Sequence, residues 1–106
     1  MTWTVEYLKE AQADLVKLDH SQQIHVLKSI QKVSTNPLPN NRGGYGKPLG
    51  NHSKAKLAGY LKIKLLKLGI RVVYRLEEEQ GIMKIIIISV REDEKVYLEA
   101  QKRIKK

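Results

Sequence analysis

The chain has 106 residues, enough for one domain, and it contains no cysteine, which excludes a disulfide scaffold, a thiolate metal site and a cysteine nucleophile. Twenty Lys and Arg against eleven Asp and Glu give a net charge of +9, which points to a polyanionic or acidic partner. The longest apolar run is too short to span a bilayer, and the N-terminus lacks the features of a signal peptide. We therefore expect a cytoplasmic protein.

The first part of the chain predicts a strand followed by two helices. Residues 2–7 alternate between apolar and polar side chains, which is typical of a half-buried strand. Apolar residues then recur at helical spacing in residues 8–18 and again up to Asn36, where a proline follows and ends the second helix. Asp19 or Ser21 can cap that second helix. The apolar side chains assigned to the second helix are Ile24, Leu27, Ile30 and Val33, with Val26 beside them.

Residues 36–59 are expected to form a long Pro/Gly-rich loop. All three prolines and five of the seven glycines lie in this stretch. A structureless segment of this length is uncommon in a compact domain, so it is either functional or contains a short element, for which residues 53–57 are a candidate. The glycine run at 43–46 lacks the Lys-Ser/Thr ending of a phosphate-binding loop, which favours a plain flexible loop.

Three strands and a helix are predicted for the rest of the chain. Residues 60–65 and 70–76 alternate, and residues 83–90 contain a continuous apolar run that suits a strand covered on both faces. Residues 92–104 predict a helix with acidic side chains at its start and basic ones at its end. The order β-α-α-β-β-β-α defines an α+β fold, in which an antiparallel sheet packs on a helical hairpin and a C-terminal helix. The whole chain, 1–106, is expected to form a single domain.

These elements predict one hydrophobic core. Its sheet side chains are Trp3, Val5, Leu61, Ile63, Leu65, Val72, Tyr74 and Ile85 to Ile88. The helix side chains expected to pack on them are Leu15, Leu18, Ile24, Leu27 and Ile30.

The hairpin of residues 60–76 places cations opposite one another. If the apolar residues of both strands face the core, Leu65 pairs with Ile70, and Lys64 pairs with Arg71 on the other face. Like charges directly across a strand pair are destabilising, so a sequence chosen for stability alone would avoid this arrangement. The alternative is a solvated face with scattered charge. The cationic patch that we expect on this face consists of Lys62, Lys64, Arg71 and Arg75.

No metal site or conventional catalytic constellation is recognisable. His20, His25 and His52 do not have the spacing of metal ligands, and no Ser-His-Asp or paired-carboxylate arrangement is present in the pattern. We expect neither a metal nor a cofactor, so any chemistry must come from cations and a hydroxyl group.

Four motifs, in this order, resemble the RelE/StbE branch of the RelE/ParE toxin superfamily. They are Lys-x-Lys at 62–64, Gly-x-Arg-x-x-Tyr at 69–74, Ile-Ser-Val at 88–90 and Val-Tyr at 96–97. The similarity covers nearly the whole chain. It implies a RelE-like fold and the activity of a type II toxin–antitoxin mRNA interferase, a metal-independent and ribosome-dependent endoribonuclease. Such an enzyme cleaves mRNA at the A site by attack of the 2′-OH and so inhibits translation.

The resemblance also implies the site residues. RelE-type catalysis uses two strand lysines, two arginines and a C-terminal tyrosine, which correspond here to Lys62, Lys64, Arg71, Arg91 and Tyr97. The residues expected to bind RNA or the ribosome are Arg75, Lys54 and Lys56. Because crowded cations lower a lysine pKa, Lys62 or Lys64 can act as the base, and Arg71 can hold the phosphate. Arg91 would be the acid or a second clamp, and Tyr97 would stack on a base or position the 2′-OH.

The family implies mRNA, ribosomal RNA and an acidic, RelB-like antitoxin as partners, with a hetero-oligomer formed with the antitoxin and no membrane contact. The last predicted helix carries a short apolar stripe of Val96, Ala100 and Ile104, so detaching it should cost little. We therefore expect the antitoxin to displace or cover this helix and to separate Tyr97 from Arg71. Two alternatives stay open: a ParE-type toxin, which shares the fold but poisons DNA gyrase, and a non-catalytic basic module that only binds nucleic acid.

Overall fold

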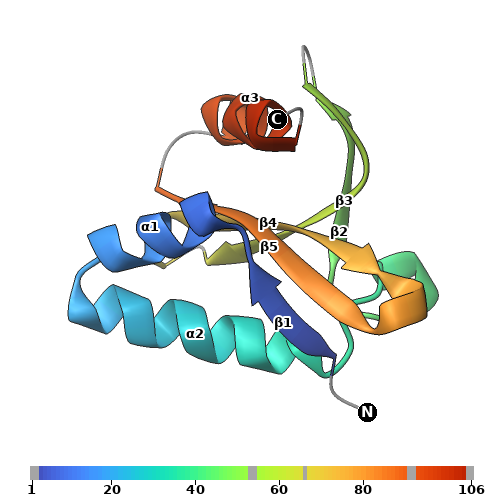
Figure 1. Cartoon of the computed structure of the whole chain (residues 1–106), viewed down its shortest axis with the longest axis horizontal. Helices are drawn as coiled ribbons and strands as arrows, with labels where there is room; N and C mark the ends of the chain where they lie inside the picture. The colour runs from blue at the N-terminus through green and yellow to red at the C-terminus, as the bar shows by residue number, and fades with distance from the viewer. Residues whose placement is uncertain (1–2, 53–54, 66, 91–92, 105–106) are drawn as a thin grey trace.

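The fold consists of one five-stranded sheet with helices on both faces (Figure 1). The structure is a computed structural model that describes residues 3–52, 55–65, 67–90 and 93–104, with only the backbone described at 50–52, 55–58, 93–95 and 97. Its elements are β1 (Thr4–Tyr7), α1 (Lys9–Lys17), α2 (His20–Ser34), the 3₁₀ turn η1 (Asn40–Arg42), β2 (Lys47–His52), β3 (Ala55–Leu65), β4 (Ile70–Glu77), the 3₁₀ turn η2 (Glu78–Gln80), β5 (Ile82–Ser89) and α3 (Asp93–Ile104). No helix among the described residues is long and apolar enough to cross a membrane.

The strands lie in the order β1-β5-β4-β3-β2, and every neighbouring pair is antiparallel except β1 with β5, which is parallel. The helical pair α1 and α2 covers one face of this sheet and α3 lies on the other, while β2 and the first part of β3 project on the α3 side (Figure 1). The predicted α+β class, with a sheet on a helical hairpin and a C-terminal helix, is confirmed, and the sheet is mostly antiparallel, with β1 as the parallel exception.

The predicted element order lacked one strand, β2. Residues 36–59 are not a continuous irregular loop, because they contain η1, β2 and the start of β3. Pro48 and Gly50 lie within β2, and the register of its pairing with β3 shifts between them. Proline and glycine are tolerated here because β2 is the edge strand, where a missing N–H donor costs little and a bulge is accommodated.

The glycine run at 43–46 is a closely packed turn, which the prediction of a plain flexible loop missed. Gly43 ends η1 with a φ of 84°, in the left-handed region that favours glycine. A Cβ atom on Gly44 would collide with the backbone of Leu38, and one on Gly46 would collide with the hydroxyl of Tyr74. That hydroxyl donates a hydrogen bond of 2.8 Å to the carbonyl of Pro37, and burial raises the pKa of Tyr74.

The start of α2 follows directly from the sequence. The Asp19 carboxylate accepts a hydrogen bond of 2.8 Å from the Gln22 backbone N–H, and the Gln22 side chain accepts one of 3.1 Å from the Asp19 N–H. These two bonds form a capping box that satisfies two backbone donors at the helix end. Of the two predicted cap residues, Asp19 is therefore the one used.

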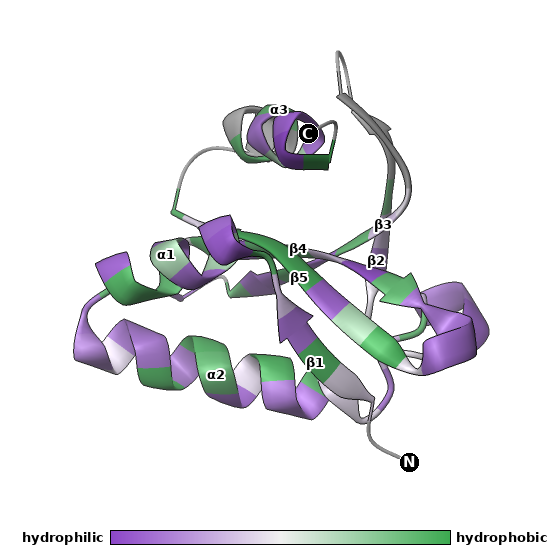
Figure 2. Ribbon diagram, viewed as in Figure 1, coloured by the Kyte–Doolittle hydropathy of each residue, from purple (hydrophilic) through white to green (hydrophobic). Residues whose placement is uncertain are grey.

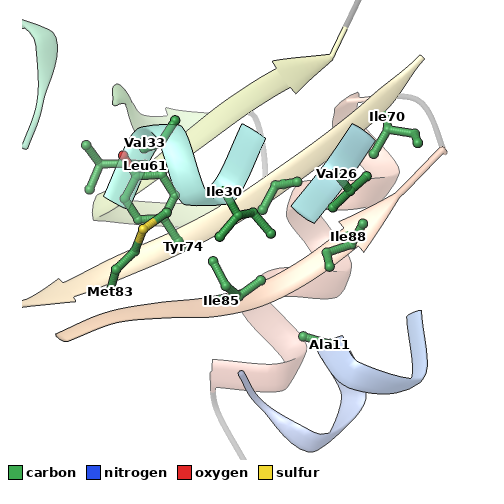
Figure 3. Close-up of a cluster of buried hydrophobic side chains, with 11 residues drawn as sticks. Ala11, Val26, Ile30, Val33, Leu61, Ile70, Tyr74, Met83, Ile85 and Ile88 are labelled. Atoms are coloured by element: carbon green, nitrogen blue, oxygen red, sulfur yellow. The ribbon is translucent and has the colours of Figure 1, made fainter. Parts of the chain in front are cut away.

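The hydrophobic core has two parts, one on each face of the sheet. The part under α1 and α2 consists of Ala11, Val26, Ile30, Val33, Leu61, Ile70, Val72, Tyr74, Met83, Ile85 and Ile88 (Figure 3). The part under α3 consists of Leu49, Val73, Ile86, Ile87, Val96 and Ala100. The hydropathy colouring follows this arrangement, with much of β5 green and the turns of α1 and α2 alternating between purple and green (Figure 2).

The prediction of one core was wrong for Ile86 and Ile87. The register of β4 with β5 shifts between Val73 and Tyr74, so that Tyr74 pairs with Ile85 and Val73 with Ile87. Ile86 is the extra residue of this β-bulge, and it lies on the same side as Ile87. The strand is therefore covered on both faces, as predicted, with two isoleucines directed to each.

The prediction was also wrong for Ile24 and Leu27, which are exposed on α2. The row 24-27-30-33 steps three residues at a time, and each step falls about 60° short of a full turn in a helix with 3.6 residues per turn. Four such residues cannot all face the sheet. The buried row is instead Val26, Ile30 and Val33, with spacings of four and three.

Replacing Ile86 with alanine is expected to lower the free energy of unfolding by about 2–5 kcal/mol, because the side chain is 2% exposed and its loss leaves a cavity under α3. Urea unfolding followed by circular dichroism measures the change. Val16→Ala is the control, since Val16 is 75% exposed on α1 and should change stability by no more than about 0.5 kcal/mol. An equally small effect of Ile86→Ala would show that this side chain does not support the α3 face.

Candidate functional site

Four cations lie together on the sheet face that carries α3. Lys62 is the register partner of Lys47 in β2, and Lys64 is the register partner of Arg71 in β4. Directly paired residues share a face, and Lys62 and Lys64 are two positions apart on β3, so all four side chains start from the same face. We call Lys47, Lys62, Lys64 and Arg71 the cationic cluster.

The predicted pairing of β3 with β4 is confirmed along its whole length. Leu65 pairs with Ile70 on one face, and Lys64 pairs with Arg71 on the other. Lys62 lies opposite Val73, and Tyr60 lies opposite Arg75, also as predicted. Like charges therefore do face one another across this hairpin, an arrangement that costs stability.

Lys47 is a member of the cluster that the sequence pattern did not identify. It lies in the stretch that was expected to be irregular, so no register could be assigned to it. The only available signal was its place directly before a proline, at the start of what proves to be an edge strand.

The cluster changes the proton affinity of one lysine. Partial burial is the main cause that lowers the pKa of Lys62, and the charge of Lys64, a hydrogen bond with Lys64, and the charges of Lys47 and Arg71 lower this pKa further. Lys62 therefore gives up its proton at a lower pH than an ordinary lysine. Cationic crowding, the cause expected from the sequence, contributes to this lowered pKa, but burial contributes most.

Arg71 lies at the centre of a row that crosses three strands. Lys64 in β3 is its partner on one side, and Ser89, the last residue of β5, is its partner on the other. One guanidinium nitrogen of Arg71 donates a hydrogen bond of 3.3 Å to the carbonyl of Gly69. A hollow of about 40 Å³ lies between Lys64 and Arg71.

Arg75 is on the same face but outside the cluster. It lies four residues from Arg71 along β4, a distance of about 13 Å at the usual strand rise. Its guanidinium forms an ion pair of 3.4 Å with Glu77, and its register partner in β5 is Lys84. The charge around Arg75 is therefore mixed, and the register partner of Arg71 in β3 is a second cation, Lys64.

The remaining predicted site residues cannot be placed in the same detail. Arg91 and Lys54 lie outside the described residues. Only the backbone is described for Lys56, which lies in β3, and for Tyr97, which lies in the first half of α3. Lys56 precedes Lys62 by six residues, about 20 Å along an extended strand, so it is distant from the cluster.

A hollow of about 430 Å³ adjoins the cluster between α2 and the end of β3, and Lys64 is one of the residues that line it. A second hollow, of about 420 Å³, lies between α1, β5 and α3. Four neighbouring cations give the cluster the charge to bind one segment of a larger anionic chain. Its lysines and arginine supply the groups that bind phosphate, the arginine with two parallel donors.

Comparison with known proteins identifies the family. No family model matches the chain, but an Escherichia coli protein named as a RelE-like toxin is 30% identical over 108 residues, which span 99% of this chain and all of the relative. The chain belongs to the RelE-like toxin family. The family that the four sequence motifs indicated is thereby confirmed.

Solved structures agree with this membership in the RelE-like family. A variant of Escherichia coli RelE in the free state, with two arginines replaced by alanine, is 25% identical, with a TM-score of 0.75 over 98% of this chain and 99% of that one. The toxin–antitoxin complex RelBE2 of Mycobacterium tuberculosis contains a chain that is 27% identical, with a TM-score of 0.69 over 86% of this chain and the whole of the other. The RelE-like fold is shared over nearly the full length.

Proposed function

We propose that this protein is the toxin of a type II toxin–antitoxin system and a ribosome-dependent endoribonuclease that cuts mRNA in the A site. The observation that carries the proposal is the cationic cluster, in which Lys62 has a lowered pKa and lies two residues from Lys64, itself paired with Arg71. A pair of like charges lowers the stability of the fold, so its presence is expected where the charges take part in binding or catalysis.

The cluster fits the requirements of RNA cleavage by the 2′-OH. This reaction needs a base for the hydroxyl, positive charge at the phosphorus and an acid for the departing 5′-oxygen. Lys62 is the proposed base, because its proton is held less tightly than that of an ordinary lysine. Lys64 and Arg71 are proposed to hold the scissile phosphate, Arg71 with two donors.

Arg91 and Tyr97 complete the proposed site. Arg91 follows Ser89 by two residues, and Ser89 is paired with Arg71, so the chain leaves β5 beside the cluster. We assign Arg91 the role of acid or second phosphate clamp, and Tyr97 that of positioning the 2′-OH or stacking on a base. Arg75, Lys54 and Lys56 are proposed to contact RNA or the ribosome outside the site of cleavage.

An open site of this kind depends on a large partner. The cations of the cluster lie on the surface of the sheet, and positioning of reactants contributes several kcal/mol to such reactions. The ribosome is proposed to supply this positioning by holding the mRNA in line for attack. Cleavage of free RNA is then expected to be slow.

The proposed regulator is an acidic antitoxin. The related RelBE2 chain of Mycobacterium tuberculosis was solved as a toxin–antitoxin complex, and the net charge of +9 attracts an acidic protein over long range. We propose that a RelB-like partner forms a hetero-oligomer with this chain and covers or displaces α3.

Mapping the 5′ ends of cellular mRNA after induction of the chain tests the proposed function. New ends within codons, in frame, and dependent on translation are the expected result. Intact mRNA together with DNA breaks would overturn it in favour of a gyrase poison. RNA that is bound but uncut would overturn it in favour of a binding module.

A further inference from the structure

A partly buried ion pair joins α1 to α3, near the two ends of the chain. The Arg103 guanidinium of α3 contacts the Asp14 carboxylate of α1 through two nitrogen–oxygen pairs, at 2.6 and 3.1 Å. The two side chains are 10% and 14% exposed. Arg103 also contacts Glu99, one helical turn earlier, at 3.3 Å. Although burial alone would lower the pKa of Arg103, its bonds to Asp14 and Glu99 raise this pKa.

This pair also satisfies the open edge of β5. The parallel pairing of β1 with β5 ends at Ile85, just before the bulge. Beyond that point, Arg103 donates a hydrogen bond of 2.9 Å to the Ile86 carbonyl, and Asp14 accepts one of 3.1 Å from the Ile88 N–H. We call Asp14 and Arg103, with these two backbone groups, the latch.

The latch is one of the contacts that hold α3 on the sheet. Isolated helices as short as α3, with 12 residues, are marginal in water. Among its described side chains, Val96 and Ala100 are fully buried and small, and Leu98 and Ile104 are partly buried against the same cluster. In the C-terminal half of α3, Arg103 adds an ionic contact through two nitrogens, which helps to fix the helix over the sheet.

The same helix lies next to the cationic cluster. Val96 and Ala100 pack in one group with Val73, and Val73 is the register partner of Lys62. Tyr97 follows Val96 and precedes Arg103 by six residues, about 9 Å along the helix axis. A rotation or shift of α3 would therefore move Tyr97 relative to Lys62.

We propose that Asp14 and Arg103 are positioning residues for RNA cleavage, which hold α3 on β5 and so fix Tyr97 beside the cationic cluster. This inference rests on the proposed function. Displacements of about 1 Å can reduce catalysis about 10²-fold, so a residue that only holds the helix can have a large effect on the rate.

A charged latch can also open at moderate cost. A hollow of about 420 Å³ lies beside it, lined in part by Lys17, Glu99 and Arg103, so water can reach the pair when α3 moves. When the ion pair separates, both charges are hydrated again, which offsets part of the lost attraction. Apolar side chains of the same size would gain no such hydration when they are exposed to water. The ion pair therefore favours one docked position of α3 and still allows the helix to detach from the sheet.

The test compares Arg103→Gln with Arg42→Gln, which removes the same charge from an exposed ion pair with Glu78. Hydrogen exchange of the isolated protein measures how firmly α3 is held on the sheet, and single-turnover cleavage on programmed ribosomes measures the rate of mRNA cleavage.

In Arg103→Gln, amides of residues 96–104 should exchange at least 10-fold faster, with those of α2 unchanged. Its cleavage rate at saturating ribosome should fall by about 10²-fold with little change in the half-saturating concentration. Arg42→Gln should match the wild type in both measurements.

Unchanged exchange in α3 of Arg103→Gln would overturn the latch, and faster exchange with an unchanged cleavage rate would overturn its positioning role. If Arg103→Gln does not fold, Arg103→Lys retains the charge without the two-nitrogen contact and should give smaller changes in the same direction. If exchange in α3 of Arg103→Gln is faster but the wild-type protein itself cleaves no mRNA, the ion pair does hold α3 on the sheet. The proposed function, and not the latch, would then be overturned.

Discussion

Replacing Arg71 with alanine is expected to abolish growth arrest and to lower the rate of mRNA cleavage by about 10²–10³-fold, the usual effect of removing one group that stabilises charge in the transition state. Arg71 pairs with Lys64 and with Ser89, so it lies in the middle of the cationic row. Its removal leaves Lys62 and Lys64 in place but takes away the two-donor contact with phosphate. Arg71→Lys restores the charge without that geometry and should recover only part of the rate.

The fold of Arg71→Ala should be intact. The side chain is partly exposed, and its register partner in β3 is a like charge. The urea midpoint should therefore differ little from that of the wild type, as for most substitutions outside the core. Arg42→Ala is the matched control, because it removes an arginine from an exposed ion pair and should leave growth arrest unchanged. A folded Arg71→Ala protein with wild-type toxicity would show that Arg71 does not hold the scissile phosphate.

The register of the β3–β4 hairpin could be predicted because apolar side chains alternate along both strands, apart from Tyr60 and Val73, which pack on the α3 side. A shift of one residue would have paired core residues with cations, so only one pairing kept both apolar rows on the same face. That register also places Lys64 opposite Arg71, with Lys62 on the same face. Three of the four members of the cationic cluster thus follow from a period of two and a short turn.

The remainder of the cluster could not be predicted in this way. β2 contains Pro48 and Gly50 and shifts register, so it shows no alternation that would place Lys47 opposite Lys62. The bulge in β5 falls inside four consecutive isoleucines, where no change of pattern marks it. Both features break the period on which such predictions depend.

The latch was beyond sequence reasoning for a different reason. Asp14 and Arg103 are 89 residues apart, and each has an ordinary place on the polar side of its own helix pattern. Their contact depends on where β1 stops along β5 and on how α3 crosses the sheet. Such long-range contacts are fixed by packing, and local periodicity carries no information about them.

Replacing Lys62 with methionine is expected to separate activity from stability. As the proposed base, Lys62 should account for about 10²–10⁴-fold of the cleavage rate. In the wild type, the single-turnover rate should rise with pH around a midpoint below about 10.4, the ordinary lysine value, because the pKa of Lys62 is lowered. Lys47→Gln removes one of the charges that lower this pKa and should move the midpoint to higher pH.

The stability of Lys62→Met should change in the opposite sense. The pKa of Lys62 is lower in the folded than in the unfolded chain, so protonated Lys62 destabilises the fold at every pH below the folded pKa. This destabilisation disappears as the pH rises from the folded towards the unfolded value. Lys62→Met should therefore unfold at higher urea than the wild type at pH 7, and the difference should narrow as the pH approaches 10. Lys28→Met, which removes the same charge from an exposed position of α2, is the control for the loss of a lysine. A stability gain from Lys62→Met that stays constant with pH would show that the lowered pKa of Lys62 is not its source, and a wild-type cleavage rate in the same variant would exclude Lys62 as the base.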